Sequence, residues 1–179
     1  MRLSISNTSE SQALTMTLAA VGLVAASAMI HLVVGIRSLV GIEQSDVVGL
    51  LAGAFILWGL LLYGLVAVFI SGVISPRTGA VLLVVAMLLS VVAYIDWHVF
   101  QLSDQMLTQL GVLETTGHNH HGHGHEEHTH GSAGTVLSEH LRADTVALVT
   151  KGIEVLAIGL FAISLLVGKD KRSSKTHDV

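Results

Sequence analysis

Cysteine is absent from this 179-residue sequence, which excludes a disulfide framework and any metal site built on thiolates. Proline, which breaks or kinks a helix, occurs only once, so the sequence can form long helices. Charged residues make up 12% of the chain, about half the share usual in soluble domains. The net charge is −4 and the single basic cluster lies at 169–175, so we expect no nucleic-acid partner. No serine, cysteine or paired-carboxylate arrangement typical of hydrolytic enzymes occurs, and we expect no enzymatic activity.

Hydrophobic residues, by contrast, make up 51% of the chain and are gathered into four long runs. They cover 13–36, 47–71, 79–100 and 146–168, each long enough to cross about 30 Å of hydrocarbon as a helix. The predicted fold class is therefore all-α, an integral membrane four-helix bundle in the lipid bilayer. It occupies 13–168, between a polar tail at 1–12 and a basic tail at 169–179.

The first run also contains Ala26-Ser27-Ala28, which resembles the small-residue cleavage site of a signal peptide. The apolar run continues past this point to Ile36, and the polar tract before it has one arginine rather than a compact basic region. We therefore expect the first helix to be retained as a membrane span.

Lysine and arginine are unevenly distributed between the two sides of the predicted bundle. Four spans place both termini on one side, where six basic residues lie: Arg2, Arg77, Lys169, Lys171, Arg172 and Lys175. The opposite side has two, Arg37 and Arg142. The positive-inside rule then predicts a multi-pass protein of the cell membrane, with cytoplasmic termini and the long third loop outside.

The third and fourth helices are predicted to extend beyond the membrane as an antiparallel pair. An apolar stripe at helical spacing continues the third through Leu102, Met106, Leu110 and Leu113. The fourth is expected to begin near an N-cap at Thr135. Between them, the glycine- and histidine-rich loop at 115–134 is expected to be disordered.

This loop contains the most informative feature of the sequence, seven histidines within 118–130. A polar, glycine-spaced tract cannot form a core, whereas neutral imidazole is a common ligand of borderline metal ions. The pattern predicts weak, multi-site binding of Zn²⁺, Ni²⁺, Co²⁺ or Cu²⁺. A flexible linker and a pH-responsive segment, charged below about pH 6.5, are the alternatives. The candidate ligands are His118, His120, His121, His123, His125, His128 and His130.

Histidine-rich loops of this kind resemble those of divalent-cation transporters, including the ZIP and cation diffusion facilitator families. The resemblance covers the loop alone and implies uptake, sequestration or sensing of metal ions. Those families have more spans and usually hold such loops in the cytoplasm. Their helices also carry His and Asp four residues apart, whereas this chain has Asp96 and His98 two apart.

Ionisable residues inside the spans are costly, and here the topology places all of them in the outer leaflet. They are His31, Asp96, His98, Lys151 and Glu154. One hypothesis is that His31, Glu154 and either Asp96 or His98 converge on a metal ion. The other is that Lys151 and Glu154 form a structural ion pair, and that His98 beside Trp97 is an interfacial anchor.

A polar stripe on the fourth helix is predicted to lead from the loop towards these residues. Since His140 and Asp144 share a helix face with Lys151 and Glu154, they are candidates for relaying a metal ion into the membrane.

Two further functions fit the same sequence. Gly49 with Gly53, and Gly22 with Ala26, are small-residue pairs that let helices approach closely, which we expect within one chain. Their use against other subunits would make the protein an accessory or structural subunit of a larger membrane complex or a homo-oligomer. Alternatively, His31 and His98 at matching depth predict bis-histidine haem ligation in a redox protein.

Overall fold

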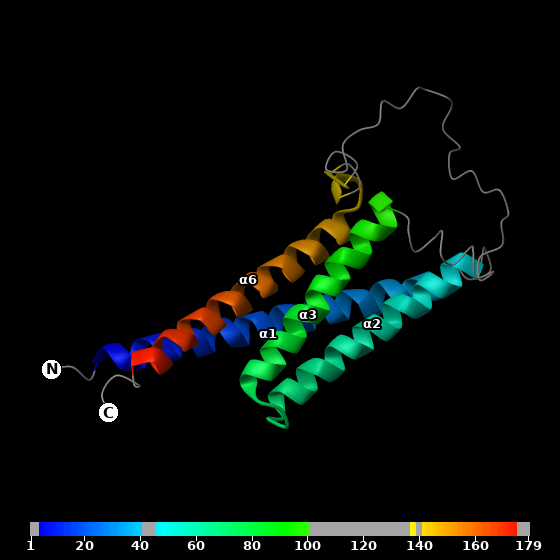
Figure 1. The fold of residues 1–179 in the computed structure, drawn as a ribbon. Helices are drawn as coiled ribbons and strands as arrows, with labels where there is room; N and C mark the ends of the chain where they lie inside the picture. The colour runs from blue at the N-terminus through cyan, green and yellow to red at the C-terminus, as the bar shows by residue number, and fades with distance from the viewer. Residues whose placement is uncertain (1–3, 41–45, 101–136, 139–140, 175–179) are drawn as a thin grey trace. The chain divides into compact units, whose positions relative to one another are not determined.

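A computed structural model describes residues 4–40, 46–100, 137–138 and 141–174, and these residues are helical apart from short turns (Figure 1). The elements are α1 (Ser4–Leu39), α2 (Asp46–Ile70), α3 (Pro76–Ile95), a π-helical turn (Asp96–Phe100) and α6 (Thr145–Ser174). The predicted all-α class is confirmed.

Four of these helices are long and apolar enough to cross a membrane: Ser11–Leu39, Gly49–Ile70, Pro76–His98 and Thr145–Val167. Large apolar side chains are exposed on every one of them, among them Leu18, Leu57, Leu89 and Leu166. Such a surface suits hydrocarbon, where an exposed leucine loses nothing by facing lipid. The findings thus identify a small multi-pass membrane protein, as the hydropathy pattern predicted.

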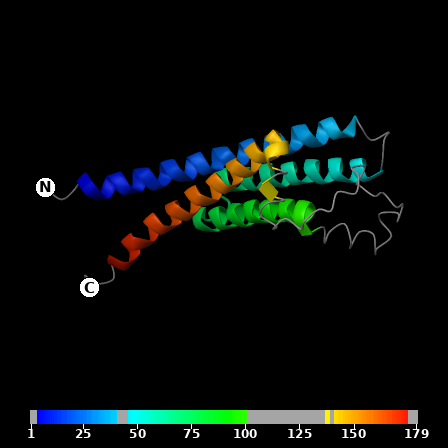
Figure 2. The ribbon, with the colours of Figure 1, turned by 90° about the horizontal axis from the view of Figure 1, so that it is seen from above.

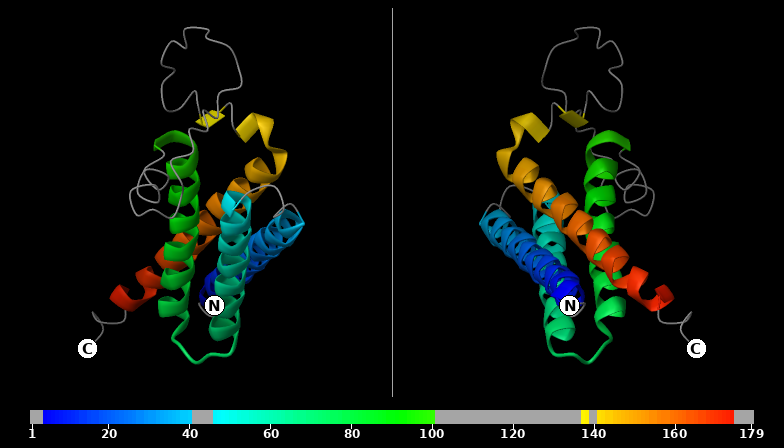
Figure 3. Two further views of the ribbon diagram at one scale, coloured as in Figure 1. Left: turned by 90° about the vertical axis from the view of Figure 1, so that its right-hand side faces the viewer. Right: turned by 90° about the vertical axis from the view of Figure 1, so that its left-hand side faces the viewer.

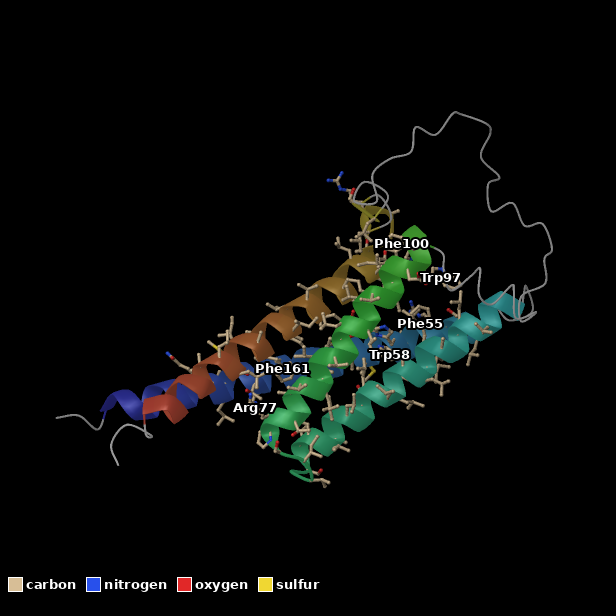
Figure 4. All side chains as sticks on the ribbon, in the orientation of Figure 1. Phe55, Trp58, Arg77, Trp97, Phe100 and Phe161 are labelled. Atoms are coloured by element: carbon tan, nitrogen blue, oxygen red, sulfur yellow. The ribbon has the colours of Figure 1, made fainter. Side chains whose placement is uncertain are left out.

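The helices pack around a core of small and aliphatic side chains that lies within one compact unit, Met1–Leu89 with Thr150–Val179. Figures 2 and 3 show α1 and α2 side by side along much of their length in this unit. Phe161 of α6, labelled in Figure 4, is fully buried and meets the ring of Phe69 of α2 edge-on. The largest other buried core residues are Val24, Leu62, Leu83 and Met87.

The close approach of α1 and α2 depends on two glycines. A Cβ added to Gly35 of α1 would lie 2.9 Å from the carbonyl oxygen of Ala52, and one added to Gly59 of α2 would lie 2.9 Å from that of Ala28. Both distances are shorter than a carbon and an oxygen tolerate, so the backbones meet where these side chains are missing.

Three of the small residues predicted for this role, Gly22, Ala26 and Gly53, do not have it in the part of the chain that the structure describes. A Cβ on Gly22 or Gly53 would meet no atom within 4 Å, and Ala26 is exposed. The prediction was wrong for these three residues because a pattern of small residues gives their spacing but not the helix face that the core selects.

A tight turn joins α2 to α3. Gly72 has φ of +72°, a left-handed conformation that favours glycine and commonly follows a helix C-terminus. The hydroxyl oxygen of Ser75 then accepts a hydrogen bond from the backbone N–H of Thr78 at 3.1 Å, and Pro76 occupies the first helical position. These local interactions determine where α2 ends, where α3 begins and how the chain reverses its direction between them.

Two helix starts differ from expectation. Helix α1 begins at Ser4, within the predicted polar tail, because extending an existing helix adds one backbone hydrogen bond for each residue fixed. Helix α6 begins at Thr145, since the Asp144 carboxylate accepts hydrogen bonds from the N–H groups of Val146 and Ala147. The expected start near Thr135 lies outside the described residues; 137–138 and 141–143 are helical, and the helix is interrupted at Asp144.

Replacing Gly35 or Gly59 by alanine is expected to destabilise the protein by about 1–3 kcal/mol, because the new methyl group meets backbone atoms of the facing helix. Denaturant unfolding in detergent, followed by circular dichroism, measures the change. Gly22→Ala and Gly53→Ala are the matched controls, and we expect them to be neutral or slightly stabilising. Equal losses in all four variants would show that helix conformation, not close packing, sets the effect.

Candidate functional site

Hydroxyl groups within the spans mostly bond to their own helix. Thr17 donates to the carbonyl of Ala13, Ser38 to that of Val34, and Ser164 to that of Phe161, each at 2.9 Å. This is the usual way in which a helix satisfies a hydroxyl in hydrocarbon. Ser27 differs, because its hydroxyl donates to a side chain on another helix, Glu154 of α6, at 2.9 Å.

Glu154 is the centre of a buried polar cluster formed by α1 and α6, comprising Ser27, His31, Lys151 and Glu154. The Glu154 side chain is 0% exposed, and its two carboxylate oxygens have different donors. Oε1 accepts from the Ser27 hydroxyl, and Oε2 accepts from the Lys151 ammonium at 2.8 Å. The hydrogen-bonded ion pair compensates for removing the carboxylate from water.

The third side chain around Glu154 is His31, one helical turn beyond Ser27 on α1. Its ring Nδ1 lies 2.9 Å from the Ser27 carbonyl oxygen, and its Nε2 lies 3.8 Å from Glu154 Oε1. Only 6% of the side chain is exposed, and Phe55 of α2, labelled in Figure 4, packs against the ring at 5.7 Å between centroids. Two polar residues of α1 therefore face one carboxylate of α6.

The other two ionisable residues of the spans, Asp96 and His98, belong to the second compact unit, Ser90–Val149. Both lie in the π-helical turn that follows α3. The ring centroids of Tyr94 and His98 are 4.4 Å apart, so these two side chains, four residues apart in sequence, contact each other. Partly buried, Asp96 and His98 both take part in interactions of their own.

Of the residues proposed to connect the loop with the membrane, the structure describes Asp144 but not His140. Asp144 serves as the N-cap of α6, so its Oδ1 is occupied by two backbone N–H groups. His140 and the seven loop histidines, His118 to His130, lie outside the described residues. The predicted metal relay therefore stays a prediction.

No group of three or more His, Asp or Glu side chains that could hold a metal ion occurs among the described residues. His31 and Glu154 come together, but Oε2 of the carboxylate is engaged by an ammonium group. Structural and catalytic zinc sites use at least three protein ligands. In this part of the chain, the cluster better suits an ionised carboxylate than a bound metal.

Sequence reasoning identified Glu154, His31 and Lys151 from their charge in a span, but missed Ser27. A serine in an apolar helix usually bonds to its own backbone, so it gave no signal of its own. The available signal was its spacing, because Ser27 lies four residues before His31 and thus on the same helix face.

No protein-family model matches the chain, and no curated protein or solved structure is similar to it at a significant level.

Removing one charge of the buried ion pair is expected to cost far more than removing both. Glu154→Leu takes away the carboxylate 2.8 Å from the Lys151 ammonium, which lies on a side chain only 14% exposed, and should destabilise the protein by about 3–5 kcal/mol. In Lys151→Met/Glu154→Leu, an apolar pair of similar size should recover most of that loss.

A double-mutant cycle of unfolding in detergent measures this coupling. Ser164→Ala is the control for removing a buried polar group, since the Ser164 hydroxyl bonds only to its own helix and should matter little. Additive effects of the two charge substitutions would show that the ion pair does not stabilise the fold.

Proposed function

We propose that this multi-pass membrane protein binds divalent transition-metal ions through its histidine-rich loop on the outer side of the membrane. The observation that carries the proposal is the set of seven histidines within 118–130, together with Glu126 and Glu127. Imidazole and carboxylate groups at this density bind Zn²⁺, Ni²⁺, Co²⁺ or Cu²⁺ by exchanging among several ligand sets. Uptake, sequestration and sensing are the roles such a loop can serve.

The arrangement within the spans supports metal capture by the loop rather than a second metal site in the membrane. Two candidate ligands, His31 and Glu154, are bonded to Ser27 and Lys151. The Nε2 atom of His31 lies 3.8 Å from a carboxylate oxygen, an arrangement that does not favour the haem alternative, in which this nitrogen binds iron. Passage of ions across the bilayer would need further helices, from a homo-oligomer or a partner subunit.

Calorimetric metal titration of the untagged protein in detergent tests the proposal. We expect several weak sites per chain, lost when all seven histidines of 118–130 are replaced by asparagine, because asparagine keeps the loop length and polarity without imidazole ligands. The variant His31→Gln/Glu154→Gln is the matched control, and it should retain the binding. Full binding by the asparagine variant would refute the proposal.

The orientation is tested by cysteine labelling, which the cysteine-free sequence makes simple. A membrane-impermeant maleimide should label Ser132→Cys in intact cells, because the loop is proposed to lie outside. It should reach Val73→Cys, in the exposed turn between α2 and α3, and Ser173→Cys only after permeabilisation. The opposite pattern would invert the topology and place the histidine loop in the cytoplasm.

A further inference from the structure

The hydrogen bonds around His31 assign the hydrogen of its neutral ring to Nδ1. The acceptor 2.9 Å from Nδ1 is the backbone carbonyl oxygen of Ser27, which cannot donate. The Ser27 hydroxyl, 3.4 Å from Nδ1, has one hydrogen and directs it to Glu154 Oε1. Nδ1 must therefore be the donor, and the Nε2 atom of the neutral ring carries a lone pair.

A carboxylate oxygen, itself an acceptor, lies near this lone pair. Nε2 lies 3.8 Å from Oε1 of Glu154, beyond hydrogen-bonding distance. The Glu154 carboxylate accepts hydrogen bonds from the Lys151 ammonium and from the Ser27 hydroxyl. An electron pair and an anion that face each other repel, and one proton on Nε2 replaces this repulsion by an imidazolium–carboxylate attraction.

Few other ionisable groups surround the His31 ring. From α6, the ring faces the Glu154 carboxylate, which is paired with the Lys151 ammonium, and from α2 the apolar ring of Phe55 covers it. The only other ionisable residue of the first span is Arg37, and residues 76–89 of α3 contain only Arg77. Uptake of one proton thus adds one positive charge to the cluster.

We propose that His31 and Glu154 form a proton-binding site inside the membrane, in which Nε2 of His31 takes up one proton and the carboxylate of Glu154 stabilises the resulting imidazolium. Proton-relaying groups of membrane proteins are buried carboxylate and imidazole side chains of this kind. The proposal goes beyond metal capture and uses only residues of the bundle, so it stands or falls independently of the histidine loop.

A proton fits this site better than a metal ion does. A divalent cation between Nε2 and Oε1 would have two protein ligands and would lie beside the Lys151 ammonium, already bonded to the other carboxylate oxygen. A proton needs only one acceptor atom, Nε2, and the nearby carboxylate stabilises the charge it brings.

Nitrogen-15 NMR of histidine-labelled, full-length protein in lipid nanodiscs tests the proposal. The background is the variant with asparagines at the seven loop histidines, and His31→Gln identifies the His31 signals. From about pH 9 to about pH 4, a range that brackets ordinary histidine and glutamate titration, His31 should change from the Nδ1–H tautomer to imidazolium. Glu154→Gln should require at least a tenfold higher proton concentration for the same change.

Three results would overturn the proposal: a hydrogen on Nε2 at high pH, a His31 that stays neutral throughout, or identical titrations in the parent protein and Glu154→Gln. A shift of the Nε2 signal on adding Zn²⁺ at a pH where the ring is neutral would instead assign the site to a metal. The tautomer and the titration of the parent protein decide the question even if Glu154→Gln does not fold.

Discussion

A carboxylate removed from water must find its donors inside the protein, and the buried Glu154 imposes this constraint on the bundle. Lys151 from the preceding turn neutralises it, and Ser27 supplies a second donor from another helix. The ion pair with Lys151 lies entirely within α6, whereas the hydrogen bond from the Ser27 hydroxyl connects α6 to α1. The position of α1 is therefore linked to the chemistry of one side chain in the first half of α6.

The packing of α1 against α2 serves the same arrangement. Gly35 and Gly59 bring the two backbones together on either side of His31 along α1, since Gly59 faces Ala28. Phe55 of α2 then closes over the imidazole. The polar cluster thus has an apolar cover on the α2 side, while large aliphatic side chains cover the outside of the helices. Polar groups inside and apolar groups outside is the arrangement that a bilayer demands.

Hydropathy and span length were sufficient to predict the four membrane helices, because each apolar run is long and almost uncharged. The same rule identified Lys151, Glu154 and His31 as residues that need partners. Which partners they have depends on how the helices are rotated against each other, and rotation is set by packing. For this reason the wrong glycines were chosen for close contact, and Ser27 was overlooked.

The central claim is that His31 of α1 and Glu154 of α6 meet inside the membrane. Solid-state NMR of the protein in bilayers, with nitrogen-15 in histidine and carbon-13 in the glutamate carboxyl groups, measures it directly. The 3.8 Å separation of Nε2 and Oε1 predicts a dipolar coupling between the two labels that disappears in His31→Gln. A spectrum without any coupling that depends on His31 would show that His31 of α1 does not lie next to the Glu154 carboxylate.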